Sequence, residues 1–254
     1  MRKKDEPADR LLLQLSRREI LYGGMENGAI RSLKRIPVET GEALLPCLQE
    51  FLGPQQSGAG QQSVLVSLDT DRVCLVPADF YDVSYSDSYL ALCGVGAADA
   101  ERIVVTAPRG GVVALVCVDS RMDDYLQHRY GKVDYVHPLQ LAATSSGGAP
   151  VIEAVLTHGL VHLSASAGRL LFAESLPCRT EADLLYALDR VRRLYPQYRF
   201  RISLSGAGAD RLYGEVARYF RPVSVGRAAV PRRIVSREER SAFIPLIRMS
   251  HANY

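Results

Sequence analysis

Residues 151–194 read VIEAVLTHGLVHLSASAGRLLFAESLPCRTEADLLYALDRVRRL, and this stretch decides the fold. Three short apolar runs, broken at Gly159 and Gly168, predict three strands that are joined by tight turns. Thr180 and Asp183 then have the spacing of a capping box, and leucines recur at helical spacing beyond them. The stretch therefore predicts an antiparallel meander followed by an amphipathic helix.

The same order of strand, turn and helix-capping residues occurs near the N-terminus, at residue numbers lower by 140 and without a gap. The matched pairs are Gly168 and Gly28, Pro177 and Pro37, Thr180 and Thr40, Leu184 and Leu44, Leu185 and Leu45, and Leu188 and Leu48. Strand positions agree as well, with Val151, Val155 and Leu160 matching Leu11, Leu15 and Ile20. A turn glycine, a strand-ending proline and a helix cap in one register indicate a duplicated supersecondary unit.

Composition limits the class of protein. The chain has 254 residues, 47% of them hydrophobic, which is enough to fill one large core or two modest ones. A formal net charge of +3 is too small to imply a polyanionic partner. Five scattered cysteines without a CxxC pair are typical of buried thiols in a reducing compartment. Neither a signal peptide nor an apolar run near the ~18 residues of a membrane span is present, which predicts a cytoplasmic protein without membrane insertion.

The remaining segments supply the elements of two similar halves. Strands are predicted at residues 11–16, 20–25, 30–38, 64–68, 72–76, 103–106, 112–118, 133–136, 200–204 and 223–225. Helices are predicted at residues 40–52, 86–93, 119–130, 138–144 and 210–220, the first kinked or delayed by Pro46. The Ser-Ser-Gly-Gly run at 145–148 predicts the boundary, so the halves are residues 1–146 and 147–254, the second ending in a basic arm that packs back on the body.

Three strands, a helix, a strand, a helix and a strand, given twice, is the order of a duplicated ribonuclease-H-like α/β fold with mixed sheets. Residues 151–176 with Thr180, and residues 202–209 (ISLSGAGA), resemble the second half of the actin-like ATPase superfamily, especially its pilus-assembly and cell-division members. Residues 133–139 (VDYVHPL) resemble the strand and helix that precede that half. Residues 75–82 (LVPADFYD) resemble an uncharacterised bacterial family with an actin-like ATPase fold. The resemblance implies this fold for nearly the whole chain.

The chain departs from the superfamily at the two turns that matter for phosphate chemistry. Active members carry an Asp-Gly or Asp-Ile-Gly turn at the first hairpin of each half, where backbone amides hold phosphates and the carboxylate positions a metal ion. Here the corresponding turns are residues 16–19 (SRRE) and 157–159 (THG), and neither contains an aspartate. Without this aspartate, the turns lack a carboxylate that coordinates Mg²⁺ and positions the attacking water. Glu153 precedes the second turn, but strand alternation predicts that it is a surface carboxylate.

Gly206, Ala207 and Gly208 form the one nucleotide-like feature that remains. Such a strand-to-helix turn lets a base and ribose lie close to the backbone. A tight turn before a helix also needs glycine for conformational reasons alone, and a short glycine pattern without a phosphate partner favours this structural interpretation.

Other chemistries find less support in the sequence. His158 and His162 straddle a predicted hairpin rather than sharing a helix face, which disfavours a zinc site. The first strand of each half supplies at most Glu153, whereas a two-metal nuclease needs several carboxylates. No G-x-S-x-G nucleophile elbow is present.

The preferred hypothesis is a non-catalytic cytoplasmic scaffold or interaction module with degenerate ATPase motifs, no catalytic residue, no metal, no cofactor and an unidentified protein partner. One alternative is an ATP- or ADP-binding protein, with Mg²⁺, that uses Gly206–Gly208 for the base and Arg17, Arg18 or His158 for the phosphates; as an enzyme it would be an ATPase. Another is a nucleic-acid-binding module built on Arg232, Arg233, Arg237 and Arg240. The aromatic residues Tyr213, Tyr219 and Phe220 fall at helical core spacing, which disfavours nucleic acid.

Overall fold

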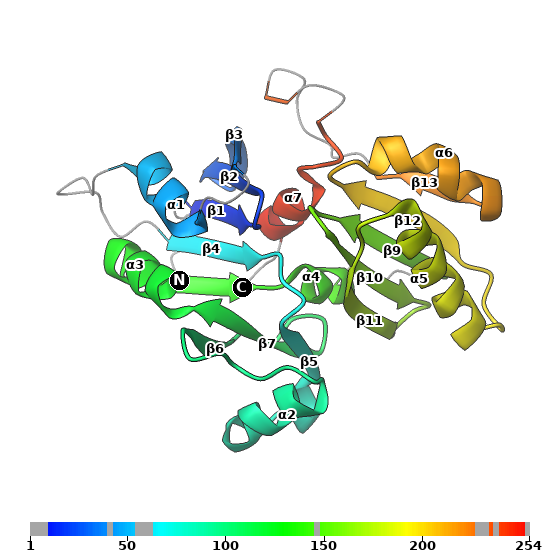
Figure 1. The fold of residues 1–254 in the computed structure, drawn as a ribbon, viewed down its shortest axis with the longest axis horizontal. Coiled ribbons are helices and arrows are strands. Elements are labelled where there is room, and N and C mark those ends of the chain that lie inside the picture. The colour runs from blue at the N-terminus through cyan, green and yellow to red at the C-terminus, as the bar shows by residue number, and fades with distance from the viewer. Residues whose placement is uncertain are drawn as a thin grey trace, which may run out of the picture.

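The computed structural model describes residues 10–39, 43–53, 63–144, 148–226, 234–235 and 239–251, which form two lobes side by side (Figure 1). The sheet of the first lobe has the order β3 (Ala29–Pro37), β2 (Glu19–Glu26), β1 (Arg10–Leu15), β4 (Ser63–Leu68) and β8 (Val133–Val136). The sheet of the second has the order β11 (Leu170–Pro177), β10 (Leu160–Ser166), β9 (Val151–Leu156), β12 (Arg201–Gly206) and β13 (Val223–Val225). In each, the first three strands pair antiparallel and the last two join in parallel, so the two halves share one topology.

The residue correspondence between the halves differs by one position from the predicted one in the first two strands. Leu15 pairs with Ile20 across the first hairpin, and Leu156 pairs with Val161 across the second. Leu15 is therefore equivalent to Leu156 and not to Val155. A one-residue slip of this kind would place every side chain on the opposite face of its sheet.

The ungapped prediction failed here because of a turn of different length. Both middle strands carry a register shift at equivalent places, between Gly24 and Met25 in β2 and between Ala165 and Ser166 in β10. Four residues lie between the paired Met25 and Ile30, whereas three lie between the equivalent pair of Ser166 and Leu170. The predicted correspondence consequently holds only from the turn glycines Gly28 and Gly168 onward.

Helix ends follow the local sequence closely. α5 (Glu181–Leu194) begins with the predicted capping box, in which the hydroxyl of Thr180 accepts from the amide of Asp183 and the carboxylate of Asp183 accepts from the amide of Thr180. Asp119 caps α3 (Ser120–Tyr130), which ends at Gly131. α1 (Leu44–Leu52) begins late, as one of the two readings of Pro46 predicted; its first-turn amides have no intrahelical acceptor, so proline is tolerated there. The predicted cap Thr40 lies outside the described residues.

A small third sheet is inserted between β4 and α3, and the sequence predicted its strands without predicting that they form a separate sheet. Its order is β5 (Val73–Pro77), β7 (Val112–Asp119) and β6 (Glu101–Val105), all antiparallel. Between β5 and β6 lie two short 3-10 turns, η1 (Ala78–Phe80) and η2 (Val83–Tyr85), and the helix α2 (Ser86–Leu92). Residues 78–100, called the α2 projection below, extend away from both lobes at the bottom of Figure 1.

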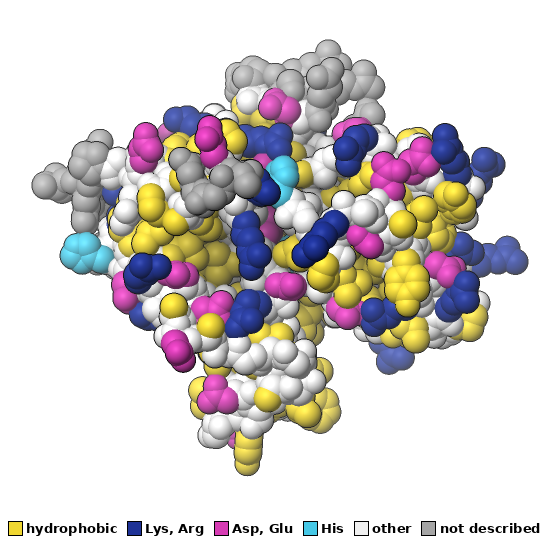
Figure 2. Space-filling view, viewed as in Figure 1, with side chains coloured by type: hydrophobic (Ala, Val, Ile, Leu, Met, Phe, Trp, Pro, Cys, Tyr) yellow, Lys and Arg dark blue, Asp and Glu magenta, His cyan; other side chains and the backbone are white. Residues whose placement is uncertain are grey.

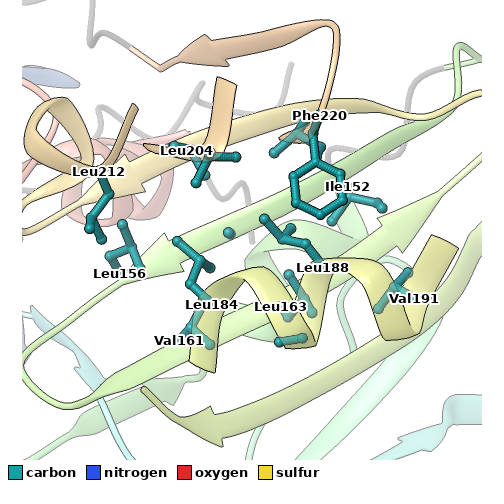
Figure 3. Packing of buried hydrophobic residues seen from close by; sticks show 14 of the residues in the cluster. Ile152, Leu156, Val161, Leu163, Leu184, Leu188, Val191, Leu204, Leu212 and Phe220 are labelled. Atoms are coloured by element: carbon teal, nitrogen blue, oxygen red, sulfur yellow. The ribbon is translucent and has the colours of Figure 1, made fainter. Parts of the chain in front are cut away.

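Each lobe has its own hydrophobic core. In the second, α5 and α6 (Ala209–Tyr219) bury an apolar stripe against the sheet, where Leu184 and Leu188 meet Ile152 and Leu204 (Figure 3). Burying each such side chain contributes about 1.5–3 kcal/mol. The α1 and α3 side of the first lobe has an equivalent core that includes Leu48.

The C-terminal segment packs back on the body, as predicted, and joins the lobes. α7 (Ile244–Ser250) lies against β1 and β2, where Leu246 and Phe243 share a cluster with Leu12 and Leu21. α4 (Pro138–Thr144) contacts β10, β11 and α7 from the other direction. The predicted boundary between residues 146 and 147 falls at a segment, 145–147, that is outside the described residues.

Candidate functional site

A cleft of about 920 Å³ lies between the two lobes, at the ends of β1, β4 and β9. Residues 16–18 line it from the first half, and residues 157–159 line it from the second. The two hairpin turns that the resemblance identifies as phosphate turns therefore do meet at one cleft. Its charged lining is mixed: Arg17, Arg18, Arg72, Arg179 and His158, with Asp69, Asp71, Glu101 and Asp119.

The first turn satisfies its own backbone. The hydroxyl oxygen of Ser16 accepts from the amides of Arg18 (3.3 Å) and Glu19 (3.0 Å). The same hydroxyl donates to the carbonyl of Glu19 at 2.9 Å, and the amide of Ser16 donates to that carbonyl too. A phosphate at this turn would need those amides as donors, and an internal acceptor already occupies them.

The two turns also contact each other. Nε2 of His158 in the second turn lies 3.4 Å from Oε2 of Glu19, the buried carboxylate at the start of β2. Nε of Arg35 donates to the same oxygen at 2.6 Å. Burial alone would raise the pKa of Glu19, but hydrogen bonds and charge from His158 and Arg35 outweigh it and hold that pKa below 4.5. Glu19 is therefore a carboxylate that ties the halves together across the cleft.

A buried polar cluster lies behind the cleft. Nε2 of Gln14 in β1 donates to both carboxylate oxygens of Asp69, at 3.0 and 2.9 Å. His162 in β10 places Nε2 3.6 Å from Asp69 and forms a 2.7 Å hydrogen bond through Nδ1 with the hydroxyl of Ser175 in β11. The side chains of Asp69 and His162 are almost wholly enclosed. The carboxylate that follows β4 is thus held by Gln14 of the first half, and His162 of the second half lies beside it.

His137, between β8 and α4, completes this cluster. Its ring meets that of His162 edge-on, with centroids 5.0 Å apart. Nε2 lies 3.0 Å from the carbonyl of Thr70, and Nδ1 accepts from the amide of Leu139, so the neutral Nε2–H tautomer satisfies both contacts. Burial, and then the neighbouring His162, lower the pKa of His137 well below 6.5. His137 is a neutral residue of the folded protein.

Gly206, Ala207 and Gly208 are not among the described residues that line this cleft. The amide of Gly206 donates to the carbonyl of Ser241 in the C-terminal segment at 2.8 Å, and the amide of Ala207 donates to the carbonyl of Leu156. A Cβ at Gly206 would lie 2.0 Å from the oxygen of Leu156, and its φ is +89°. Glycine is therefore required here for chain packing, whatever else the turn does.

Two predictions about single side chains were wrong. Glu153 is not a surface carboxylate, because Arg248 of α7 binds both of its oxygens in a largely enclosed pair. Tyr213 and Tyr219 are not core residues, with exposed fractions of 42% and 66%, although Phe220 is buried as predicted. The buried stripe of α6 runs through Leu212 and Val216, and the two tyrosines flank it.

His158 and His162 point to different partners, as their predicted hairpin placement implied. Within the described ranges, no three His, Cys, Asp or Glu side chains are grouped so that they could hold a metal ion. No helix in those ranges has the length and hydropathy that crossing a membrane requires. Of the arginines suggested for nucleic acid, Arg232, Arg233 and Arg237 lie outside the described residues, and only Arg240 lies inside.

None of the sequence patterns described above predicted the cluster of Gln14, Asp69, His137, His162 and Ser175. A signal was available, since Gln14 and His162 are polar residues inside apolar strand runs and Asp69 directly follows another. A buried polar group needs a partner, which would have directed attention to these positions.

Comparison with known structures identifies the fold. A Bacteroides thetaiotaomicron protein, described as having an actin-like ATPase fold and unknown function, is similar with a TM-score of 0.80 at 14% identity, covering 100% of this chain and 99% of its own. The PilM–PilN type IV pilus biogenesis complex contains a chain similar at TM-score 0.64 and 14% identity, covering 95% and 97%. AlfA, from B. subtilis plasmid pLS32 and solved as a filament, gives 0.51 at 8% identity, covering 97% and 100%. The predicted actin-like ATPase fold is confirmed.

No curated protein matches the sequence. A family model described as "Protein of unknown function (DUF3822)" matches residues 8–189, which include nearly all of the first half, the second meander and most of α5. This span is well over half of the chain, and it agrees with the predicted membership of an uncharacterised family with this fold. The chain is therefore a member of the DUF3822 family, with an actin-like ATPase fold.

Proposed function

We propose that this protein is a non-hydrolysing member of the actin-like fold that acts in the cytoplasm as a scaffold or interaction module. The observation that carries the proposal is the set of hydrogen bonds and charged contacts that the two cleft turns make within the protein. Ser16 occupies the amides of the first turn, and Glu19 binds His158 of the second. Groups that would hold phosphates in an ATPase are here engaged with each other.

The carboxylates near the cleft support the same view. A metal-bound phosphate needs a carboxylate with free oxygens. Asp69 is the one that follows the strand next to β1, and both of its oxygens accept from Gln14. Glu101 is engaged by Arg72, whose Nη2 lies 2.6 Å from it. Displacing these partners would leave buried polar groups unpaired, which costs about 1–3 kcal/mol for each group.

A surface suited to protein contact lies on the α2 projection. Four large hydrophobic side chains are exposed there: Phe80, Val83, Tyr85 and Leu92, with Phe80 at 76% and Leu92 at 85%. Residues 78–100 also contain four aspartates and no Lys, Arg or His. Figure 2 shows hydrophobic and acidic side chains over this lower tip, without Lys or Arg in that view. An apolar patch with one sign of charge favours a partner that presents apolar and basic side chains.

The structural neighbours agree with an interaction role. The PilM structure is that of a complex with PilN, which shows that a protein of this fold assembles with another protein in that system. Two similar halves, residues 1–146 and 147–254, would have arisen by duplication, and their shared strand order and equivalent register shifts support that origin. After duplication, the cleft turns diverged while the topology stayed.

Phosphate release from ATP tests the absence of hydrolysis. The purified chain is incubated with millimolar ATP and Mg²⁺, and free phosphate is measured against a buffer blank and an active actin-like ATPase. We expect release at the level of the blank. Release above the blank that disappears in an Arg17→Ala, Arg18→Ala double variant would refute the proposal.

Partner capture tests the surface. The chain is immobilised and exposed to a lysate of its native cells at low and high salt, beside a Phe80→Ser, Leu92→Ser variant. The matched control is Tyr186→Ser, Leu194→Ser on α5, which removes two other exposed large hydrophobic side chains, 73% and 55% exposed. We expect a partner that the projection variant loses, the control keeps and salt weakens. Equal capture by all three forms would place the contact elsewhere.

A nucleotide ligand without hydrolysis is the second candidate, because the cleft of about 920 Å³ has Arg17, Arg18 and Arg179 at its rim. Such a volume accommodates a ligand of nucleotide size. A thermal-shift series with ATP and ADP, with and without Mg²⁺, decides this: ligand at a hundred times its Kd stabilises by about 2.7 kcal/mol. A flat response to millimolar nucleotide removes the candidate. Nucleic-acid binding through the basic C-terminal region stays a prediction, tested by binding at low salt that weakens steeply as salt rises.

A further inference from the structure

Two cysteines meet at the base of the α2 projection. Cys93 directly follows α2, and its thiol donates a hydrogen bond to the sulfur of Cys74 in β5, with the two Sγ atoms 2.9 Å apart. Cys74 is 6% exposed and lies in a core with Val76, Leu90 and Leu115. Cys93 is exposed to solvent. The sulfur of Cys93 is therefore accessible to a small oxidant, and the buried sulfur of Cys74 lies in contact with it.

We propose that Cys74 and Cys93 are a redox modification site, which a peroxide converts from two thiols into a reversible disulfide. The pair is already in contact, and a bond requires the sulfur atoms to approach by about 0.9 Å more. The amide of Cys93 donates to the carbonyls of Tyr89 and Leu90 at the end of α2, so this approach requires only a small rotation of the Cys93 side chain and no backbone movement.

The reaction is balanced with hydrogen peroxide as the only other reactant. The sulfur of Cys93 attacks one peroxide oxygen, the O–O bond breaks, and the departing hydroxide takes up the thiol proton as water. The sulfur of Cys74 then attacks the sulfenic sulfur of Cys93, the S–O bond breaks, and a second water leaves with the proton of Cys74. Two thiols lose two electrons, and one peroxide becomes two waters.

The order of the two steps follows from the environments. Burial, and next the interaction with the neighbouring Cys93 sulfur, raise the pKa of Cys74 to about 12, so Cys74 stays a protonated thiol until a sulfenic acid forms beside it. Cys117 in β7 is also buried in this core, and burial is the main reason its pKa is raised. Its neighbour is Arg72 rather than another sulfur, so it does not compete.

The bond would join α2 covalently to the third sheet. α2 carries Leu92 and lies beside the exposed Phe80, Val83 and Tyr85. Oxidation would therefore fix the position of this contact surface relative to the third sheet. This consequence for partner binding rests on the proposed function, whereas the chemistry of the two sulfurs does not.

The test uses the full chain treated with hydrogen peroxide, then alkylated with N-ethylmaleimide under denaturing conditions and digested for mass spectrometry. We expect two fewer maleimide labels, a linked peptide pair containing Cys74 and Cys93, and full recovery after reduction. Hydrogen exchange of the α2 amides should slow by about tenfold in the oxidised form. Unchanged exchange would contradict the fixing of the surface.

Cys93→Ser is the decisive variant because the residue is exposed, so the substitution removes no buried side chain. It should form no linked peptide, while Cys47→Ser and Cys178→Ser should form it as the native chain does. The proposal is overturned if peroxide leaves Cys74 fully labelled while Cys93 becomes a dimedone-reactive or further oxidised acid. A link from Cys74 to Cys117, or between two chains, would overturn it as well. None of these outcomes depends on whether the protein hydrolyses ATP.

Discussion

Arg248 in α7 and Glu153 in β9 form a two-pronged ion pair, with Nη1 to Oε2 at 2.9 Å and Nη2 to Oε1 at 2.7 Å. α7 packs on the first sheet while β9 is central in the second, so this pair joins the lobes. Bidentate arginine–carboxylate pairs are the strong class of charged hydrogen bond, and this one is mostly shielded from solvent.

We expect Arg248→Ala to lower the free energy of unfolding by about 2 kcal/mol, because Glu153 is left enclosed and unpaired. The measurement is urea denaturation followed by circular dichroism. The matched control is Arg218→Ala, which removes an exposed pair with Glu215 and should cost less than about 0.5 kcal/mol. Equal losses in the two variants would show that the pair between the lobes carries no special weight.

The two glycines of the 206–208 turn should respond differently to alanine. At Gly206 a Cβ meets the carbonyl oxygen of Leu156, whereas at Gly208 no atom lies within 4 Å; both have positive φ. Gly206→Ala should cost about 3 kcal/mol or more, and Gly208→Ala about 1–2 kcal/mol. Both are measured by thermal unfolding in buffer without nucleotide. If Gly206→Ala is as stable as the native chain there, the close approach is not a packing requirement.

The contact of α7 with the first sheet should be among the largest single contributions to stability. Leu246 is fully buried against β1 and β2, and Leu246→Ala should cost about 2–5 kcal/mol through lost burial and a residual cavity. Leu194→Ala, at a residue 55% exposed on α5, serves as the control and should change stability by under about 0.5 kcal/mol. Urea midpoints report both. A small effect at Leu246 would mean that α7 is loosely docked.

His137 gives the stability a defined pH dependence. Its pKa in the folded chain is well below 6.5, so as pH falls through 6.5 the unfolded chain takes up a proton that the folded chain does not. Stability should consequently fall with decreasing pH by up to about 1.4 kcal/mol per unit below 6.5. In His137→Gln this component is gone, and the curve of unfolding free energy between pH 7 and 5 should be flatter. Parallel curves would show that folding does not lower the pKa of His137.

Local structure was predictable because its causes lie within a few residues. Thr180 and Asp183 cap α5 by contacts over three residues, and Asp119 does the same for α3. Strand runs were also visible, because a central strand such as β4, with the sequence SVLVSL, is mostly apolar when both faces are covered. Sheet membership was less visible, since β5, β6 and β7 look like any other strands until their pairing is known.

The site was predictable only in outline. The resemblance placed the two turns correctly at one cleft, but the contacts that alter their chemistry join distant segments. Gln14 and Asp69 are 55 residues apart, and Arg248 and Glu153 are 95 apart. The periodicity of hydrophobic residues along the sequence does not predict contacts between residues so far apart. It also misassigned Tyr213 and Tyr219, because a helix on an open face buries a narrow stripe and leaves its flanks in water.

The position of α7 has a consequence for biosynthesis. The face of β1 and β2 that carries Leu12 and Leu21 is translated first, yet its cover, residues 244–250, leaves the ribosome more than two hundred residues later. Until then that apolar face is exposed to solvent, is covered by a chaperone, or packs against another apolar surface. The first lobe can thus begin to fold during translation but reaches its native stability only after α7 has been synthesised, a dependence that its two-lobed shape conceals.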